Sequence, residues 1–128
     1  NALKTRDEYT FKHSVDVATM SMILAKQQGL SQKQIYEIGV AGLLHDIGKI
    51  MIPNEILTKP GKLTVAEYNI MKQHVNFGYE KVKNQNIDIR IKEACLLHHE
   101  KCDGTGYPFG LKSDHIPAVA KIIAIADV

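Results

Sequence analysis

Apolar positions recur at intervals of three and four along most of the chain, and this spacing predicts helices. The first predicted helix runs from about Tyr9 to Gln28 and ends at Gly29, because glycine commonly terminates helices. Its predicted inward face carries His13, Val17, Met20 and Leu24. No segment shows the alternating pattern of a strand, so the predicted fold class is all-α.

Four further helices are predicted from their start signals and their apolar faces. The start signals are two capping boxes, an N-cap aspartate and a first-turn proline: Ser31 with Gln34, Thr64 with Glu67, Asp88, and Pro117. The predicted inward faces carry, in order, Ile35, Ile38, Gly42 and His45; Ile70, His74 and Phe77; Ile91, Cys95 and His98; and Ala120, Ile123, Ala124 and Asp127. Pro53, residues 59–62 and the glycine-rich segment 104–110 are predicted loops.

Each of the five predicted helices carries a histidine or an aspartate on its apolar face. A lone histidine in such a place is more commonly a satisfied core residue than a ligand, but five histidines and two aspartates buried without partners would be costly. The full set is His13, His45, Asp46, His74, His98, His99 and Asp127. Because ligands from several helices of a bundle can meet in its core, the pattern predicts a helical bundle around a metal centre with two ions. A structural zinc site is disfavoured, since the chain has no paired cysteines.

Composition narrows the class of protein without changing this picture. The 128 residues fit one domain, 1–128, and are 45% hydrophobic and 23% charged. A net charge of +2 gives no support for binding to a nucleic acid polymer. Cys95 and Cys102 form no disulfide framework, and no apolar run approaches the roughly 18 residues that span a bilayer. A cytoplasmic domain without membrane insertion is therefore expected.

Several residues near the predicted centre have two interpretations each. Lys49 is either a solvated charge at a helix end or a cation that binds a phosphate oxygen, and its place beside the metal set favours the second. Glu100 and Asp103 either orient imidazoles or serve as cap and turn residues, and the sequence does not decide. Tyr107 and Pro108 form either a recognition lip or a stiff turn.

The candidate ligand residues and the segments around them resemble the HD-GYP family, a branch of the HD phosphohydrolase superfamily. The matching segments, in chain order, are 13–14, 45–49, 59–64, 74, 98–100, 103–104, 106–108 and 126–128. The match covers nearly the whole chain in the expected order. The resemblance implies an enzyme with the all-helical HD-domain fold, a metal-dependent phosphodiesterase of bacterial signal transduction. It would hydrolyse cyclic di-GMP to linear pGpG and sometimes on to GMP.

The resemblance also implies roles for single residues. One divalent ion would be held by His13, His45, Asp46 and Asp127, and a second by Asp46, His74, His98 and His99. Asp46 would bridge the two ions, which are iron or manganese in the family, and would act in catalysis with Lys49. The substrate-recognition loop would include Lys59, Gly106, Tyr107 and Pro108.

Two departures from the family pattern shape the expectation. Tyr9 stands where some members have a glutamate that binds a third metal, so a dinuclear site is predicted. The family sequence usually continues past Val128 into a basic segment that contacts the nucleotide, so the domain is expected to be truncated at its C-terminus. Two alternatives stay open: another HD-superfamily nucleotide phosphohydrolase, or a non-catalytic module that senses a nucleotide or docks a partner signalling domain. The complete ligand set favours the enzyme.

Overall fold

The structure is a computed structural model that describes residues 2–127, and within them it contains helices and no strand. The all-α fold class is therefore confirmed. The elements are α1 (Ala2–Gln27), α2 (Gln32–Leu44), η1 (Ile47–Met51), α3 (Asn54–Leu57), α4 (Val65–Lys72), α5 (His74–Val82), α6 (Ile89–Leu97), η2 (Ser113–His115) and α7 (Ala118–Ala126), where η marks a 3₁₀-helix. Val128, the last residue of the motif at 126–128, lies outside the described residues.

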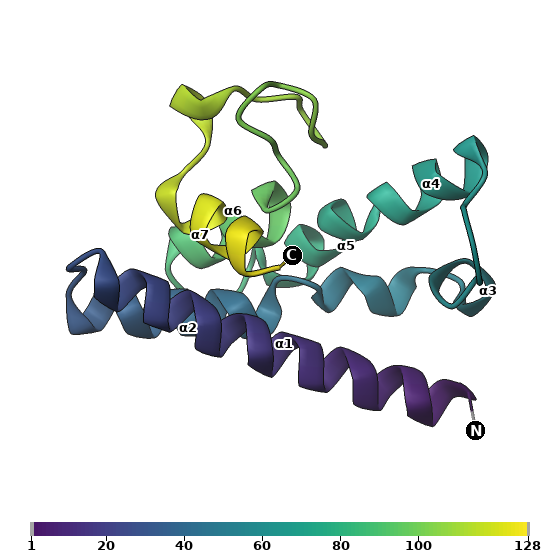
Figure 1. Ribbon diagram of the computed structural model, residues 1–128, viewed down its shortest axis with the longest axis horizontal. Coiled ribbons are helices and arrows are strands. Elements are labelled where there is room, and N and C mark those ends of the chain that lie inside the picture. The colour runs from purple at the N-terminus through teal and green to yellow at the C-terminus, as the bar shows by residue number, and fades with distance from the viewer. Residues whose placement is uncertain (1, 128) are drawn as a thin grey trace.

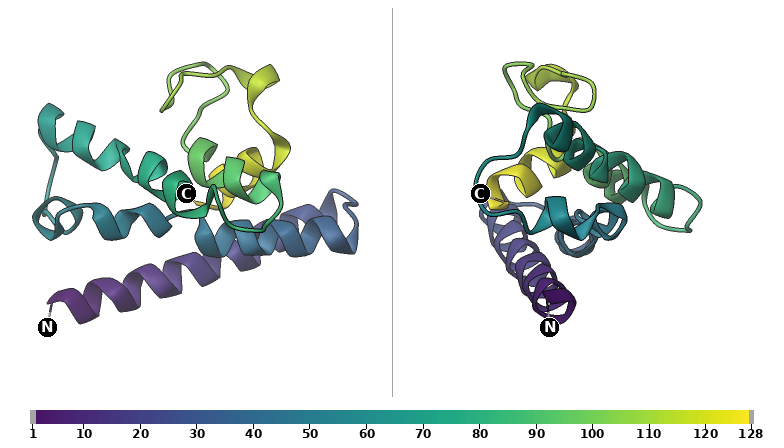
Figure 2. Two further views of the ribbon diagram at one scale, coloured as in Figure 1. Left: turned by 180° about the vertical axis from the view of Figure 1, so that it is seen from behind. Right: turned by 90° about the vertical axis from the view of Figure 1, so that its right-hand side faces the viewer.

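Helices α1 and α2 form an antiparallel pair on which α6 and α7 pack (Figure 1). The main hydrophobic core lies among these four helices and includes Val17, Ala25, Ile38, Ala41, Ile91, Ala94, Val119 and Ile123. The first half of α1 and the α3–α4 segment extend from the same side of this body, as Figure 1 and the left view of Figure 2 show. A second, smaller core of Leu97, Ile116 and Ala120 lies beneath the loop that joins α6 to α7. Within the described residues, no helix is both long and apolar enough for a membrane span.

The helix starts follow the predicted signals closely. Both capping boxes are present, at Ser31 before α2 and at Thr64 before α4. Asp88 caps α6 by accepting a hydrogen bond from the backbone N–H of Arg90. Pro117 is one residue further out than predicted, since it is the N-cap of α7. Local side-chain chemistry therefore determined where these helices begin.

The predicted third helix is wrong as a single element, because it divides at Gln73 into α4 and α5. Helix α4 has no buried residue, and Ile70, predicted to face inward, is exposed. Helix α5 instead packs against η1, where a Cβ at Gly48 would clash with the backbone carbonyl of His74. Helix α5 therefore packs into the body of the protein, whereas α4, on the other side of Gln73, buries no residue.

Three smaller expectations also failed. Helix α1 begins at Ala2 rather than near Tyr9, and η1 and α3 were not predicted. Met20 is 47% exposed, because the buried face of α1 passes through Val17, Ala18 and Ser21 instead. The inward face is thus displaced by about one residue from the predicted one, toward the close contact of α1 with α2.

Candidate metal centre

Five helices deliver polar side chains to one interior point, and four of the five deliver them at a helix end. His45 is the C-cap of α2, His98 of α6 and Asp127 of α7, while His74 is the first residue of α5. His13 lies within α1. Side chains at helix ends can reach the interior without crossing the packed faces of the helices.

The structure brings all seven predicted ligand residues together in two groups that share one aspartate. The first group is His13, His45, Asp46 and Asp127, and the second is Asp46, His74, His98 and His99. Within each group, one candidate ligand atom from every residue lies within 4.8 Å of the others. The side chains of His45, Asp46, His74 and His98 are at most 2% exposed.

Backbone carbonyls fix the orientation of three imidazoles. Carbonyl oxygens only accept hydrogen bonds, so each Nδ1 that meets one must carry the proton and donate. The three bonds run from His45 to Gly42 at 2.6 Å, from His74 to Met71 at 2.8 Å, and from His98 to Ala94 at 2.9 Å. Because Nδ1 is bonded to the backbone, each ring presents Nε2 to the cluster as the nitrogen that can bind a metal ion, which is the usual arrangement of metal-binding histidines.

Four buried polar atoms at the centre of the cluster make no hydrogen bond to a described residue. These are both carboxylate oxygens of Asp46 and the Nε2 atoms of His74 and His98. The two Nε2 atoms lie 3.3 and 3.4 Å from Asp46 Oδ1, without hydrogen-bond geometry. Two ligands each about 2.1 Å from one ion are separated by about 3 Å. The orphaned atoms therefore fit the binding of a divalent metal ion, and leaving them unpaired would be costly.

The second carboxylate, Asp127, lies between two histidines of the first group. Its Oδ1 is 2.6 Å from His13 Nε2 and 3.2 Å from His45 Nε2. Burial acts to lower the pKa of His45, but Asp127 and Asp46 outweigh burial and raise that pKa to about 10. Without metal, His45 therefore holds a proton beside these two ionised carboxylates.

The opposite side of the cluster has the reverse protonation behaviour. Burial, followed by the neighbouring His98 and His74, lowers the pKa of His99 to about 3. Burial also lowers the pKa of His98. Burial opposes the ionisation of Asp46, yet contacts from the surrounding imidazoles hold its pKa well below the usual range. Neutral imidazoles around an ionised carboxylate are in the form that binds metal.

Lys49 lies in the last turn of η1, beside the shared aspartate. Its Nζ is 3.1 Å from Asp46 Oδ2. A cavity of about 440 Å³ between α1 and η1 is lined by both Asp46 and Lys49, together with Phe11 and Ile50. This cavity connects the cluster to solvent, and the Lys49 ammonium lies where the cavity reaches the Asp46 carboxylate.

The loop after α6 is anchored by Glu100, which resolves one of the open interpretations. The buried carboxylate of Glu100 accepts hydrogen bonds from the backbone N–H groups of Phe109 and Leu111, both at 2.7 Å. Gly106 lies so close to residues 99–101 that a Cβ would clash with the His99 carbonyl oxygen. The loop thereby places the Tyr107 ring parallel to that of His99, with 4.9 Å between centres.

Two other candidates have local roles. Asp103 accepts hydrogen bonds from the backbone and hydroxyl of Thr105, so it is a turn residue. Lys59, assigned by resemblance to the recognition loop, forms an ion pair with Glu67 of α4 at 2.6 Å.

Sequence reasoning missed several residues around the centre. Tyr9 stacks on His13, with parallel rings 6.0 Å apart. Tyr68 and Lys72 lie beside Tyr107, on the side of His99 and His74. The spacing of four between Tyr68 and Lys72, which places both on one helix face, was a usable signal.

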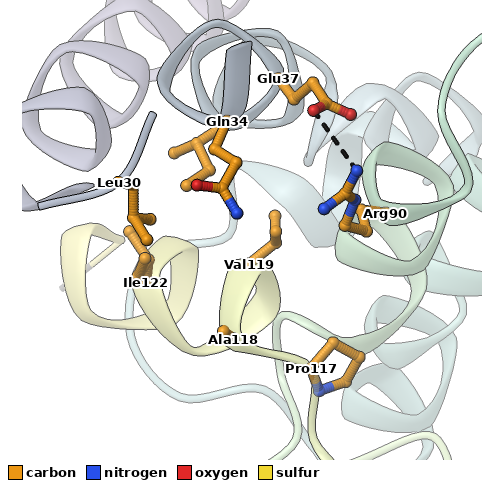
Figure 3. A pocket seen from close by; sticks show the side chains of 9 residues that line it. Leu30, Gln34, Glu37, Arg90, Pro117, Ala118, Val119 and Ile122 are labelled. Carbon is orange, nitrogen blue, oxygen red and sulfur yellow. Dashed lines mark ion pairs between the residues drawn. The ribbon is translucent and has the colours of Figure 1, made fainter. Parts of the chain in front are cut away.

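A second buried acid lies away from the cluster, between α2, α6 and α7. Glu37 is 6% exposed and meets Arg90 at 3.5 Å, as the dashed line in Figure 3 marks. Arg90 also pairs with Asp88 at 3.0 Å. The adjoining cavity of about 130 Å³ has mostly apolar walls, with Leu30 and Ile122 opposite the ion pair (Figure 3). This region contains no histidine and no second group that resembles a metal site among the described residues.

Comparison with known proteins agrees with the resemblance. A family model described as "HD domain" matches residues 1–128. A cyclic di-GMP phosphodiesterase of Pseudomonas aeruginosa is 45% identical over 127 residues, which are 98% of this chain and 31% of that protein. A 3'3'-cGAMP-specific phosphodiesterase of Vibrio cholerae is 43% identical over 131 residues, which cover 100% of this chain and 25% of that protein.

A solved structure supports the same conclusion about the fold. A protein from Bdellovibrio bacteriovorus, described as an HDG"Y"P protein, superposes with a TM-score of 0.81 at 26% identity. The match covers 92% of this chain and 39% of that one. The chain thus spans between a quarter and about a third of the length of the two curated relatives.

Proposed function

This chain belongs to the HD domain family, in its HD-GYP branch, and we propose that it is the catalytic domain of a metal-dependent cyclic dinucleotide phosphodiesterase. One observation carries the proposal: two groups of imidazole and carboxylate donors share Asp46 in the core. The names of the relatives supply the substrate class, cyclic di-GMP or 3'3'-cGAMP. A non-catalytic module is disfavoured because the chain carries every predicted ligand residue and the seven form two groups that could each hold a metal ion.

We further propose two divalent ions, iron or manganese, held by the two groups with Asp46 as the bridge. Imidazole and carboxylate donors suit both metals. When bound, such a pair lowers the pKa of a coordinated water and neutralises charge on a phosphodiester. The protein's own contribution is to hold the donors in place, which the backbone bonds to Nδ1 achieve for three of the histidines.

Lys49 and the cavity beside it are assigned to the phosphodiester. The ammonium group lies next to Asp46, so a phosphate at the cluster would have a positive group within reach of a non-bridging oxygen. Cyclic di-GMP is proposed as the substrate and linear pGpG as the product, with GMP following if the linear product is cut again. The mixed dinucleotide is the second candidate, because the Vibrio cholerae relative specific for 3'3'-cGAMP is nearly as similar to this chain.

The test is turnover by this chain, prepared without oxygen and loaded with ferrous iron or manganese. Cyclic di-GMP and 3'3'-cGAMP are offered separately, the products are resolved by chromatography, and metal content is measured on the same sample. Asp46→Asn is the control, since it keeps the size of the side chain and removes the bridging charge. We expect metal-dependent cleavage that Asp46→Asn abolishes. Cleavage that survives in Asp46→Asn, or wild-type protein that binds metal and cleaves neither dinucleotide, contradicts the proposal.

A further inference from the structure

Two tyrosines and a lysine lie at the rim of the histidine and aspartate cluster. Tyr68 and Lys72 lie four residues apart on one face of α4, and Tyr107 comes from the loop after α6. The Lys72 ammonium is 5.1 Å from the centre of the Tyr68 ring and 5.9 Å from that of Tyr107. The two rings meet edge to face, with 6.2 Å between their centres. A positive charge thus lies next to two aromatic rings.

Tyr107 connects this rim to the cluster, because its ring is stacked on that of His99. A cavity of about 160 Å³ opens beside Tyr107 and is lined by Lys72, Gln73, Asn76, Tyr107 and Pro108. Pockets that enclose whole drug-sized ligands are roughly 300–1,000 Å³. This cavity is therefore of a size for one flat ring system rather than for a whole dinucleotide.

We propose that Tyr68, Lys72 and Tyr107 form a guanine-binding subsite for the dinucleotide, an inference that rests on the proposed function. Aromatic side chains bind nucleobases by stacking, and stacking tolerates every base. Lys72 adds selectivity, because guanine presents two adjacent acceptors, O6 and N7, whereas adenine presents N7 next to an amino donor. An ammonium at the edge of the stacked base favours guanine and opposes adenine.

The other polar groups of the cavity are neutral and already bonded to each other. Asn76 Nδ2 donates to Gln73 Oε1 at 2.9 Å. A pair of amides can donate to one base or accept from another, so it gives no strong preference between the purines. Lys72 is the charged residue in the lining, and the preference for guanine is therefore assigned to it.

The first test compares wild type with Lys72→Gln on cyclic di-GMP, 3'3'-cGAMP and cyclic di-AMP, with manganese bound. The substitution removes the ammonium, and a glutamine amide can pair with adenine N6 and N7. We expect the preference for cyclic di-GMP over cyclic di-AMP, measured as a ratio of kcat/KM, to fall by about tenfold or more. Lys33→Gln, the same change at an exposed position at the far end of α2 from His45, should leave the ratio unchanged. An equal fall for all three substrates would show that Lys72 holds a phosphate instead, and would overturn the proposal.

The second test does not depend on turnover. GMP and AMP carry the same phosphate and sugar, so the difference in their affinities reports the base alone. NMR titration of the metal-free chain should give GMP about tenfold tighter than AMP, and Lys72→Gln should remove that difference. Equal affinities in wild type, or a difference that persists in Lys72→Gln, would overturn the subsite. A preference for GMP in a chain that cleaves no dinucleotide would sink the proposed activity and leave the subsite standing.

Discussion

Asp46 and Glu37 are equally well buried acids whose surroundings differ in every other respect. Asp46 is 2% exposed and Glu37 is 6% exposed, and neither carboxylate has a hydrogen-bond partner among the described residues. Three imidazole nitrogens and the Lys49 ammonium nevertheless lie between 3.1 and 3.4 Å from the Asp46 oxygens. Glu37 faces one guanidinium, that of Arg90 at 3.5 Å.

The comparison shows that a buried acid indicates a metal site only through the donors around it. An imidazole whose Nδ1 is bonded to the backbone has a lone pair on Nε2 to offer a cation. A guanidinium has no lone pair to offer, so Arg90 can neutralise Glu37 and cannot help it to bind a metal. Glu37 therefore links α2 to the start of α6, while Asp46 lies at the centre of a cluster of ligands.

The largest difference between the two acids is expected when each is replaced by its amide. Asp46→Asn should reduce kcat/KM, measured in the presence of manganese, by about a thousandfold or more, on the order of the largest losses from removing one transition-state contact. Glu37→Gln should change it by less than about twofold, since no ligand atom moves. Metal content measured on both proteins separates loss of metal from loss of folding. Equal losses in the two variants would contradict the distinction.

Removal of metal should lower the thermal stability of Glu37→Gln but not that of Asp46→Asn. A metal ion that binds only the folded state, at a free concentration of about a hundred times its Kd, stabilises that state by about 2.7 kcal/mol. We therefore expect a chelator to lower Tm by several degrees in wild type and in Glu37→Gln. Asp46→Asn should show almost no further decrease, because its cluster is already empty. A large chelator effect in Asp46→Asn would mean that metal binds elsewhere.

Metal uptake should also release protons, because His45 must lose one to become a ligand. Its raised pKa, about 10 against 6.5 in the unfolded chain, means that the metal-free folded protein holds this proton at pH 7. Because the pKa is higher in the folded state, protonation of His45 stabilises the metal-free folded protein. This contribution is fully present below pH 6.5 and is lost as pH rises through about 10. For each proton released, metal affinity should rise about tenfold per pH unit between pH 7 and 9.

Calorimetry in two buffers with different ionisation enthalpies measures this release. We expect at least one proton per chain in wild type, and the same number in Glu37→Gln. Heats of binding that do not depend on the buffer would show that His45 is already neutral. Such a result would mean that Asp46 and Asp127 do not keep His45 protonated. It would weaken the contrast between Asp46 and Glu37.

How much the sequence could predict differs between these regions. Five of the seven candidate ligand residues share an apolar helix face with hydrophobic neighbours, so their place on the helices was visible from periodicity. The bonds that orient His45 and His98 were not visible, because they depend on where α2 and α6 end and so on which ring lies next to the carbonyls of Gly42 and Ala94. The division at Gln73 was hidden as well, since Ile70, His74 and Phe77 keep a helical spacing across it.

Long-range pairing explains the remaining failures. Glu100 binds backbone groups nine and eleven residues later, which only the path of the loop brings near. Glu37 lies next to Ile38 in an ordinary amphipathic helix, and its partner Arg90 is distant in sequence. Local patterns describe helix faces and helix starts, but they contain no information about which loop or helix packs opposite a given residue.

The smallest expected effect is that of Glu37→Gln on folding stability. The amide keeps the shape of the side chain, and Arg90 retains Asp88 as a partner and is partly in water, so the loss of the buried charge is offset. We expect the free energy of unfolding, from urea denaturation at pH 7, to change by no more than about 1 kcal/mol. Glu80→Gln, which removes the exposed partner of Lys83, serves as the matched control and should show no measurable change. A loss of several kcal/mol in Glu37→Gln would mean that this ion pair, and not the apolar contacts around it, holds α2 against α6.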